Sequence, residues 1–67
     1  MSTKFQVGDI LKDAMFPSSE RLTVLAVEEV KENPFVTEVW YFFVNNRGKR
    51  SSGLQHIVEQ PGRFKKV

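Results

Sequence analysis

The chain of 67 residues contains no cysteine and a single histidine. Without cysteine it can form no disulfide, and it lacks the thiolate ligands that most small zinc modules use. One histidine, His56, among scattered carboxylates is too little for a metal site or for a serine nucleophile with its base. We therefore expect no enzyme activity, no catalytic residues, no metal and no cofactor, and a fold held together by packing alone.

Long apolar runs are also missing. No window approaches the roughly 18 apolar residues of a membrane span, and the first residues, MSTKFQVGD, are too polar for a signal peptide. The sequence therefore predicts a cytoplasmic protein that does not contact a membrane. Its length predicts one domain over residues 1–67, with a small core and modest stability.

The charged residues are unevenly distributed, although the formal net charge is only +2. Residues 1–44 carry seven acidic and four basic side chains, whereas residues 45–67 carry one acidic and six basic side chains. Such a bipolar surface attracts an anionic partner to one side. Basic turns and tails that only improve solubility would give the same distribution, so charge alone does not separate the two interpretations.

Two central segments are rich in β-branched and aromatic residues. Residues 21–31 include good helix formers, but their valines do not share one helical stripe, so we predict a long strand. Asn33 and Pro34 favour a turn, after which residues 35–45 form the returning strand. The NNRG stretch at residues 45–48 closes the next hairpin, because its asparagines and glycine tolerate positive φ.

The remaining predicted elements are short. We predict a first strand within residues 4–11 that bends at Gly8 and Asp9. A fourth strand is expected at residues 50–52 and a last strand at residues 63–67. Between these two strands we predict one helical turn, with Leu54, Ile57 and Val58 on its apolar side. Between the first two strands, Pro17 marks a loop whose Met15 and Phe16 we expect to fold back over one mouth of the core. The order is strand, loop, three strands, helical turn, strand.

This order, together with VGDIL at residues 7–11, TVLAV at residues 23–27 and a hairpin closed by a glycine turn, resembles the small SH3-like barrels. That group includes KOW-type and Tudor-like modules and many short bacterial and phage proteins. The resemblance covers nearly the whole chain and implies an all-β, five-stranded SH3-like barrel with one short helical turn before the last strand. It departs from KOW-type segments because residues 12–23 contain no glycine. An OB-like barrel, also five-stranded, is the alternative.

The stretch VWYFFV at residues 39–44 is apolar on both faces of the predicted returning strand. Alternation places Trp40, Phe42 and Val44 on one face, and Val39, Tyr41 and Phe43 on the other. One face must be core, and we expect the loop or the helical turn to cover part of the other. We expect one or two aromatics to stay exposed, with Tyr41 the best candidate because its hydroxyl tolerates water.

Basic residues adjoin these aromatics in the sequence. Aromatic side chains flanked by cations are typical of proteins that bind single-stranded nucleic acid, because the rings stack on bases and the cations neutralise phosphates. The predicted nucleic-acid-binding site comprises Trp40, Tyr41, Phe43, Arg47, Lys49, Arg50, Arg63, Lys65 and Lys66. The protein is then a non-enzymatic binding module whose partner is RNA or DNA.

A protein-interaction module or accessory subunit is the alternative. In that case the outer apolar face docks on a protein partner or on a second copy, giving a monomer or a weak homodimer. Bipolar surfaces suit protein partners and head-to-tail contacts, so the acidic side chains would matter as much as the basic ones. These acidic residues are Glu28, Glu29, Glu32 and Glu38. The sequence favours nucleic acid, because its aromatic and basic residues are neighbours.

Overall fold

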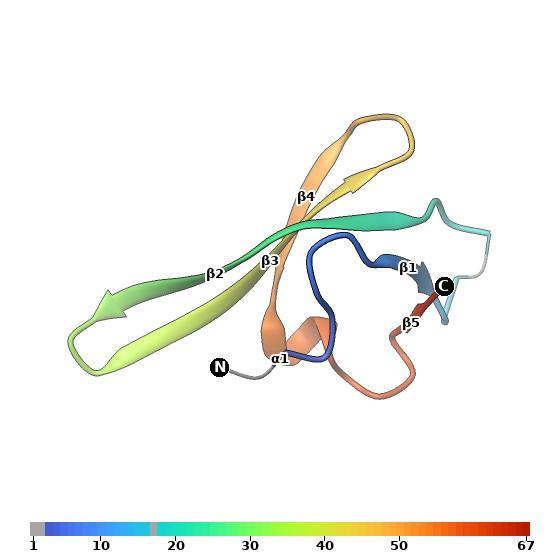
Figure 1. Cartoon of the computed structure of the whole chain (residues 1–67). Coiled ribbons are helices and arrows are strands. Elements are labelled where there is room, and N and C mark those ends of the chain that lie inside the picture. Colours follow the sequence, from blue (N-terminus) through green and yellow to red (C-terminus); the bar gives the residue numbers. More distant parts are fainter. Residues whose placement is uncertain (1–2, 17) are drawn as a thin grey trace.

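The structure is a computed structural model that describes residues 3–16 and 18–67. It contains five antiparallel strands in one sheet and one short helix (Figure 1). The elements are β1 (Ile10–Asp13), β2 (Leu22–Asn33), β3 (Val36–Asn45), β4 (Arg50–Leu54), α1 (Gln55–Val58) and β5 (Phe64–Lys66). The all-β class and the predicted order of the elements are therefore confirmed.

The strands lie in the order β4-β3-β2-β1-β5, and each neighbouring pair is antiparallel. The edge strands β4 and β5 do not pair with one another in the described part of the chain. The sheet is therefore open along a gap between these two strands, which we call the β4–β5 seam.

The β2–β3 hairpin is much longer than the strands beside it. Its pairing runs from Leu22 and Asn45 to Asn33 and Val36, whereas β1 and β4 pair only with the part nearest Leu22 and Asn45. Residues 28–39 therefore form a two-stranded extension, which we call the hairpin arm. Figure 1 shows the arm pointing away from the other strands. The molecule as a whole, with the arm included, has extents of 40 × 25 × 16 Å.

A turn precedes β1, which begins later than the alternation predicts. Gly8 has a φ of +94°, the N–H of Gln6 donates to the Asp9 carboxylate at 2.9 Å, and the N–H of Asp9 donates to the Gln6 carbonyl at 3.0 Å. The N–H of Gly8 also donates to the carbonyl of Val24 in β2 at 2.9 Å. The segment before β1 therefore lies over the core face of the sheet, where Phe5 is buried.

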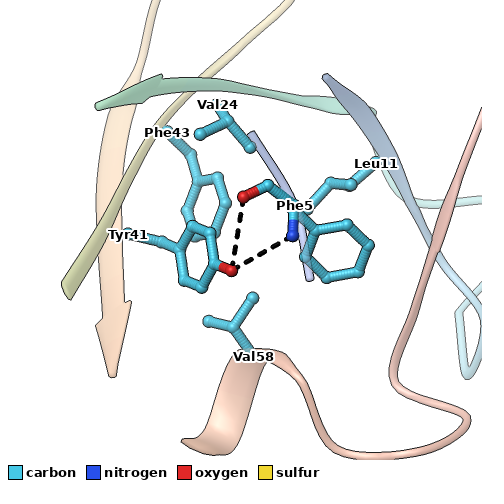
Figure 2. Packing of buried hydrophobic residues seen from close by; sticks show 6 residues of the cluster. All are labelled: Phe5, Leu11, Val24, Tyr41, Phe43 and Val58. Atoms are coloured by element: carbon cyan, nitrogen blue, oxygen red, sulfur yellow. Dashed lines mark hydrogen bonds between the residues drawn. The ribbon is translucent and has the colours of Figure 1, made fainter. Parts of the chain in front are cut away.

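The core occupies one face of the sheet. It consists of Phe5, Leu11, Val24, Tyr41, Phe43 and Val58 (Figure 2). The rings of Tyr41 and Phe43 are stacked with centroids 6.0 Å apart, and Phe5 meets Tyr41 edge-on at 6.1 Å. Of the apolar residues predicted for the helical turn, α1 buries Val58 and leaves Ile57 exposed.

Two expectations about exposure are wrong. Tyr41 is completely buried, because its face of β3 is the core face and its hydroxyl has partners inside the protein. Met15 and Phe16 are each 62% exposed and do not cover the core. Their N–H groups donate to the carboxylate of Asp13 at 2.8 and 3.1 Å, which forms a tight turn at the end of β1. Pro17, on which the loop prediction also rested, lies outside the described residues.

Replacing Tyr41 with phenylalanine tests the role of the buried hydroxyl. The change keeps the ring but leaves the N–H of Phe5 buried without its acceptor. We expect the free energy of unfolding to fall by about 1–3 kcal/mol, which is the cost of an unsatisfied buried group. Urea denaturation of the two proteins measures the difference, and equal stability would contradict this role.

Candidate functional site

Cross-strand pairing divides the sheet into the core face and an opposite face, which we call the outer face. Residues directly opposite one another on antiparallel strands lie on the same face, and successive residues of one strand alternate between faces. A register shift between Val24 and Ala26 places Ala26 opposite Phe42. The outer face consists of Ile10, Lys12, Thr23, Ala26, Glu28, Trp40, Phe42, Val44, Arg50, Ser52, Leu54 and Lys65.

Trp40, Phe42 and Val44 form a continuous apolar row on the outer face. They alternate along β3 with the buried Tyr41 and Phe43, and none of the three belongs to the core cluster. Each is half-buried, because the row and its neighbours on β2 and β4 partly cover one another. The aromatic face available to a partner is therefore that of Trp40 and Phe42. The sequence pattern predicts Tyr41 and Phe43 as binding residues beside Trp40 and does not include Phe42.

The β3–β4 turn holds its basic side chains on an ordered backbone. The side-chain oxygen of Asn45 accepts hydrogen bonds from the N–H groups of Arg47 and Lys49, both at 2.9 Å. Gly48 has a φ of +80°, whereas the asparagines of this turn do not adopt the positive φ that was also expected for them. Arg47 forms an ion pair with Glu20 at 2.6 Å, and Lys49 makes no ion pair within the described residues.

Two lysines face one another across β1 and β5. Lys12 and Lys65 are direct partners on the outer face, because the flanking residues Leu11 and Phe64 belong to the core side. Like charges directly opposite one another destabilise a sheet, and neither lysine has an ion pair among residues 3–16 and 18–67. Arg50 belongs to the same face, in a cross-strand row that continues through Val44, Thr23 and Ile10.

These cations lie at one end of the sheet. Leu22 pairs with Leu11 on one side and with Asn45 on the other, so the β3–β4 turn and the β1–β5 pair are at the same end. At the other end of the apolar row, Glu28 lies opposite Trp40 where the hairpin arm begins. The outer face is therefore cationic at one end, aromatic in the middle and acidic at the other. We call its cations the basic end, which consists of Lys12, Lys49, Arg50 and Lys65.

The other predicted basic residues lie elsewhere. Lys66 forms an ion pair with Asp9 at 3.3 Å, and the pKa of Asp9 is lowered chiefly by the hydrogen bond from the Gln6 N–H and further by Lys66. The guanidinium of Arg63 lies 5.6 Å from the centre of the Phe64 ring and lines a pocket on the β4–β5 seam. The predicted site residues that do lie on the outer face or in its adjoining turn are therefore Trp40, Arg47, Lys49, Arg50 and Lys65.

Lys12 was missed by the sequence analysis. Its alternation with the apolar Leu11 was enough to place it outward, but nothing local indicates that it faces Lys65. That pairing joins segments near the two ends of the chain. It follows from the sheet order, in which β1 lies between β2 and β5, and from the register between β1 and β5.

On the core side of β3, the hydroxyl of Tyr41 connects three segments. It accepts a hydrogen bond from the N–H of Phe5 at 3.2 Å and donates one to the carboxylate of Glu59, just after α1. The Glu59 carboxylate also accepts from the N–H of Lys4 at 3.2 Å and from the side-chain amide of Gln55 at 3.0 Å. Burial raises the pKa of Tyr41, and the Glu59 carboxylate raises it further. Burial would also raise the pKa of Glu59, but hydrogen bonds from Tyr41, Gln55 and Lys4 outweigh it and lower that pKa.

Acid should weaken this network. Because folding lowers the pKa of Glu59, its ionised carboxylate stabilises the fold above the unfolded-state pKa of about 4.3, and this contribution is lost as the pH falls through the lower folded value. We expect Glu59→Gln to be less stable than the wild type near neutral pH and to lose less stability between about pH 7 and pH 3. Urea denaturation at both pH values measures the two changes.

A matched control for this experiment is Asp9→Asn. Asp9 also has a lowered pKa, but it holds the turn before β1 and does not contact Tyr41. Hydrogen exchange should therefore accelerate at the Phe5 amide in the Glu59 variant and stay slow in the Asp9 variant. Parallel pH profiles for the wild type and Glu59→Gln would contradict the assignment.

Within residues 3–16 and 18–67, no group of three or more histidine, cysteine, aspartate or glutamate side chains could hold a metal ion. No helix in this part of the chain is long and apolar enough to cross a membrane. Comparison with protein families, with curated proteins and with solved structures gave no match.

Proposed function

We propose that the protein is a nucleic-acid-binding module whose outer face takes a single strand of RNA or DNA. Trp40 and Phe42 stack on bases, and the basic end contacts phosphates. A single strand is favoured because stacking on side chains needs bases that are free of their own duplex partners. Tyr41 and Phe43 have no direct part in this interface, since both are core residues.

The observation that carries the proposal is the opposed pair Lys12 and Lys65 beside the apolar row. Both lysines lack an ion pair within the described chain, although they are direct cross-strand partners. A phosphate between them offsets their repulsion and gains two charged contacts at once. A purely structural role explains neither this repulsion nor the exposure of the aromatic row.

The acidic end of the outer face limits the length of the bound strand. Glu28 lies opposite Trp40, so phosphates that continue onto the hairpin arm meet like charge. The interface therefore covers few nucleotides. Because its affinity depends mainly on phosphate contacts at the basic end, we expect weak binding that decreases steeply with added salt.

We also propose that the sheet is of the SH3-like type. Five antiparallel strands with a single helical turn before the last one support this assignment. Barrel closure would require β4 to approach β5 across the β4–β5 seam. The proposed architecture is an SH3-like sheet that stays open on that side.

Trp40 is the only tryptophan of the chain, so its fluorescence reports directly on the interface. Stacking should change this fluorescence when short single-stranded oligonucleotides are added at low salt. We expect Trp40→Leu to lose about 1–3 kcal/mol of binding free energy, the value of one stacked base, as measured by anisotropy of a labelled oligonucleotide. Unchanged tryptophan fluorescence and unchanged anisotropy at low salt would overturn the proposal.

Lys65→Glu separates binding from folding. It should weaken binding and reduce the salt dependence by about one phosphate contact. It also converts the repulsion with Lys12 into an attraction, so the free energy of unfolding should rise by about 0.2–1 kcal/mol. Lys31→Glu is the matched control, because it makes the same charge change on the hairpin arm. Equal loss of binding in both variants would show that net charge, and not this interface, determines binding.

A further inference from the structure

The tip of the hairpin arm carries an aromatic side chain that the fold does not use. Phe35 is 95% exposed, and its neighbour Val36 is also exposed. Figure 1 shows this tip at the far end of the arm, away from the core and from both edge strands. Phe35 and Val36 are therefore available for a contact with another molecule.

The turn that presents Phe35 is already ordered. The side-chain oxygen of Asn33 accepts the N–H of Phe35 at 2.8 Å, and Asn33 pairs with Val36 across the turn. Pro34 occupies the second position of this turn, where its fixed φ is favoured. Because the turn is held in this way, docking of Phe35 orders little additional backbone.

An apolar pocket lies on the β4–β5 seam. Its volume is about 370 Å³, and it is lined by residues 51–54 together with Phe43, Ile57, Val58 and Phe64. Successive residues of a strand point to opposite faces, so a pocket lined by four consecutive residues of β4 runs along the free edge of that strand. Ligand pockets typically have volumes of about 300–1,000 Å³, and this one is large enough for a phenyl ring.

Arg63 supplies a cation to this pocket. The backbone N–H of Arg63 donates to the carbonyl of Gln60 at 3.2 Å, and the backbone carbonyl of Arg63 accepts from the N–H of Ala14 at 2.9 Å. The backbone of Arg63 is therefore held on both sides. Its Nε is buried and has no hydrogen-bond partner in the described part of the chain. Because Arg63 lines the pocket, its guanidinium offers a cation to a carboxylate brought by another molecule.

We propose that this pocket binds the arm tip of a second copy of the chain, with Phe35 among the apolar side chains and an arm carboxylate on Arg63. Each chain has one arm and one pocket on different surfaces, and we take each copy to insert its arm into the next, a heterologous contact that builds open chains or a ring. The proposal does not depend on nucleic-acid binding. Trp40 also lines the pocket, so the two proposals are tested with separate measurements.

The negative charge of the arm is opposite to the positive charge that Arg63 gives the pocket. Four glutamates and one lysine lie within residues 28–39. Glu32 and Glu38 are close together. The pKa of Glu38 is raised chiefly by a hydrogen bond with Glu32, and repulsion between the two carboxylates raises it further. These two are the candidate partners of Arg63, since a guanidinium beside them removes their mutual repulsion. The attraction between arm and pocket should weaken with salt.

Sedimentation of the full chain at concentrations up to about 1 mM tests the proposal. The mean mass of the wild type should rise with concentration and pass beyond that of a dimer, whereas Phe35→Ala should stay monomeric. Phe16→Ala is the matched control, because Phe16 is also exposed but lies outside the arm, and it should associate like the wild type. A monomeric wild type, or a Phe35→Ala variant that associates like the wild type, would overturn the proposal.

Mixing two variants tests whether the arm of one copy pairs with the pocket of another. The Phe35→Ala variant has an intact pocket but no arm side chain to insert, and the Arg63→Glu variant has an intact arm but an altered pocket. Each variant should therefore be monomeric alone. An equimolar mixture should form a dimer and nothing larger, because only one arm and one pocket can pair. Arg63→Gln takes the place of Arg63→Glu if circular dichroism shows that the charge reversal impairs folding. A mixture that stays monomeric while the wild type associates would contradict the proposed pairing.

Discussion

The rest of the structure depends on the buried hydroxyl of Tyr41. It lies on the central strand β3 and accepts the N–H of Phe5 in the segment before β1 (Figure 2). It also donates to the carboxylate of Glu59, just after α1. A chain this short can bury only one face of its sheet. The hydrogen bonds of the Tyr41 hydroxyl hold that residue's side of β3 in the core. Every side chain that alternates with Tyr41 on β3 is then left on the outside.

The features proposed to bind a partner follow from what the core requires. Trp40 and Phe42 are outside because their neighbours on β3 are inside. Lys12 opposes Lys65 because the residues that flank them in the pairing contribute to the core side. Neither the opposed lysines nor the exposed Phe35 at the arm tip belongs to the core. Departures from the rules of stable folding tend to occur at functional sites, and these residues are such departures.

Local patterns were sufficient to predict the long strands, the helical turn and the bend at Gly8 and Asp9, but not where β1 begins or how the chain turns after it. The valines of β2 and the turn at Pro34 predicted the central hairpin correctly. The strand expected at residues 4–11 begins only at Ile10, because the Asp9 carboxylate accepts the N–H of Gln6. The expected covering loop fails for a similar reason, since Asp13 binds the N–H groups that follow it. Bonds from side chain to backbone compete with regular structure, and a hydrophobic pattern does not reveal them.

The sequence by itself determined the class of strands, the positions of the main turns and the separation of acidic from basic segments, because these depend on neighbouring residues and their backbone preferences. It also determined that β3 has two apolar faces, but alternation treats the two as equivalent. Only the tertiary structure decided between them, by bringing Phe5 and Glu59 to Tyr41. The facing of Lys12 and Lys65, and the pocket beside Arg63, were decided in the same way. Each is a contact between segments far apart in the chain, and such contacts are set by the order in which strands pair.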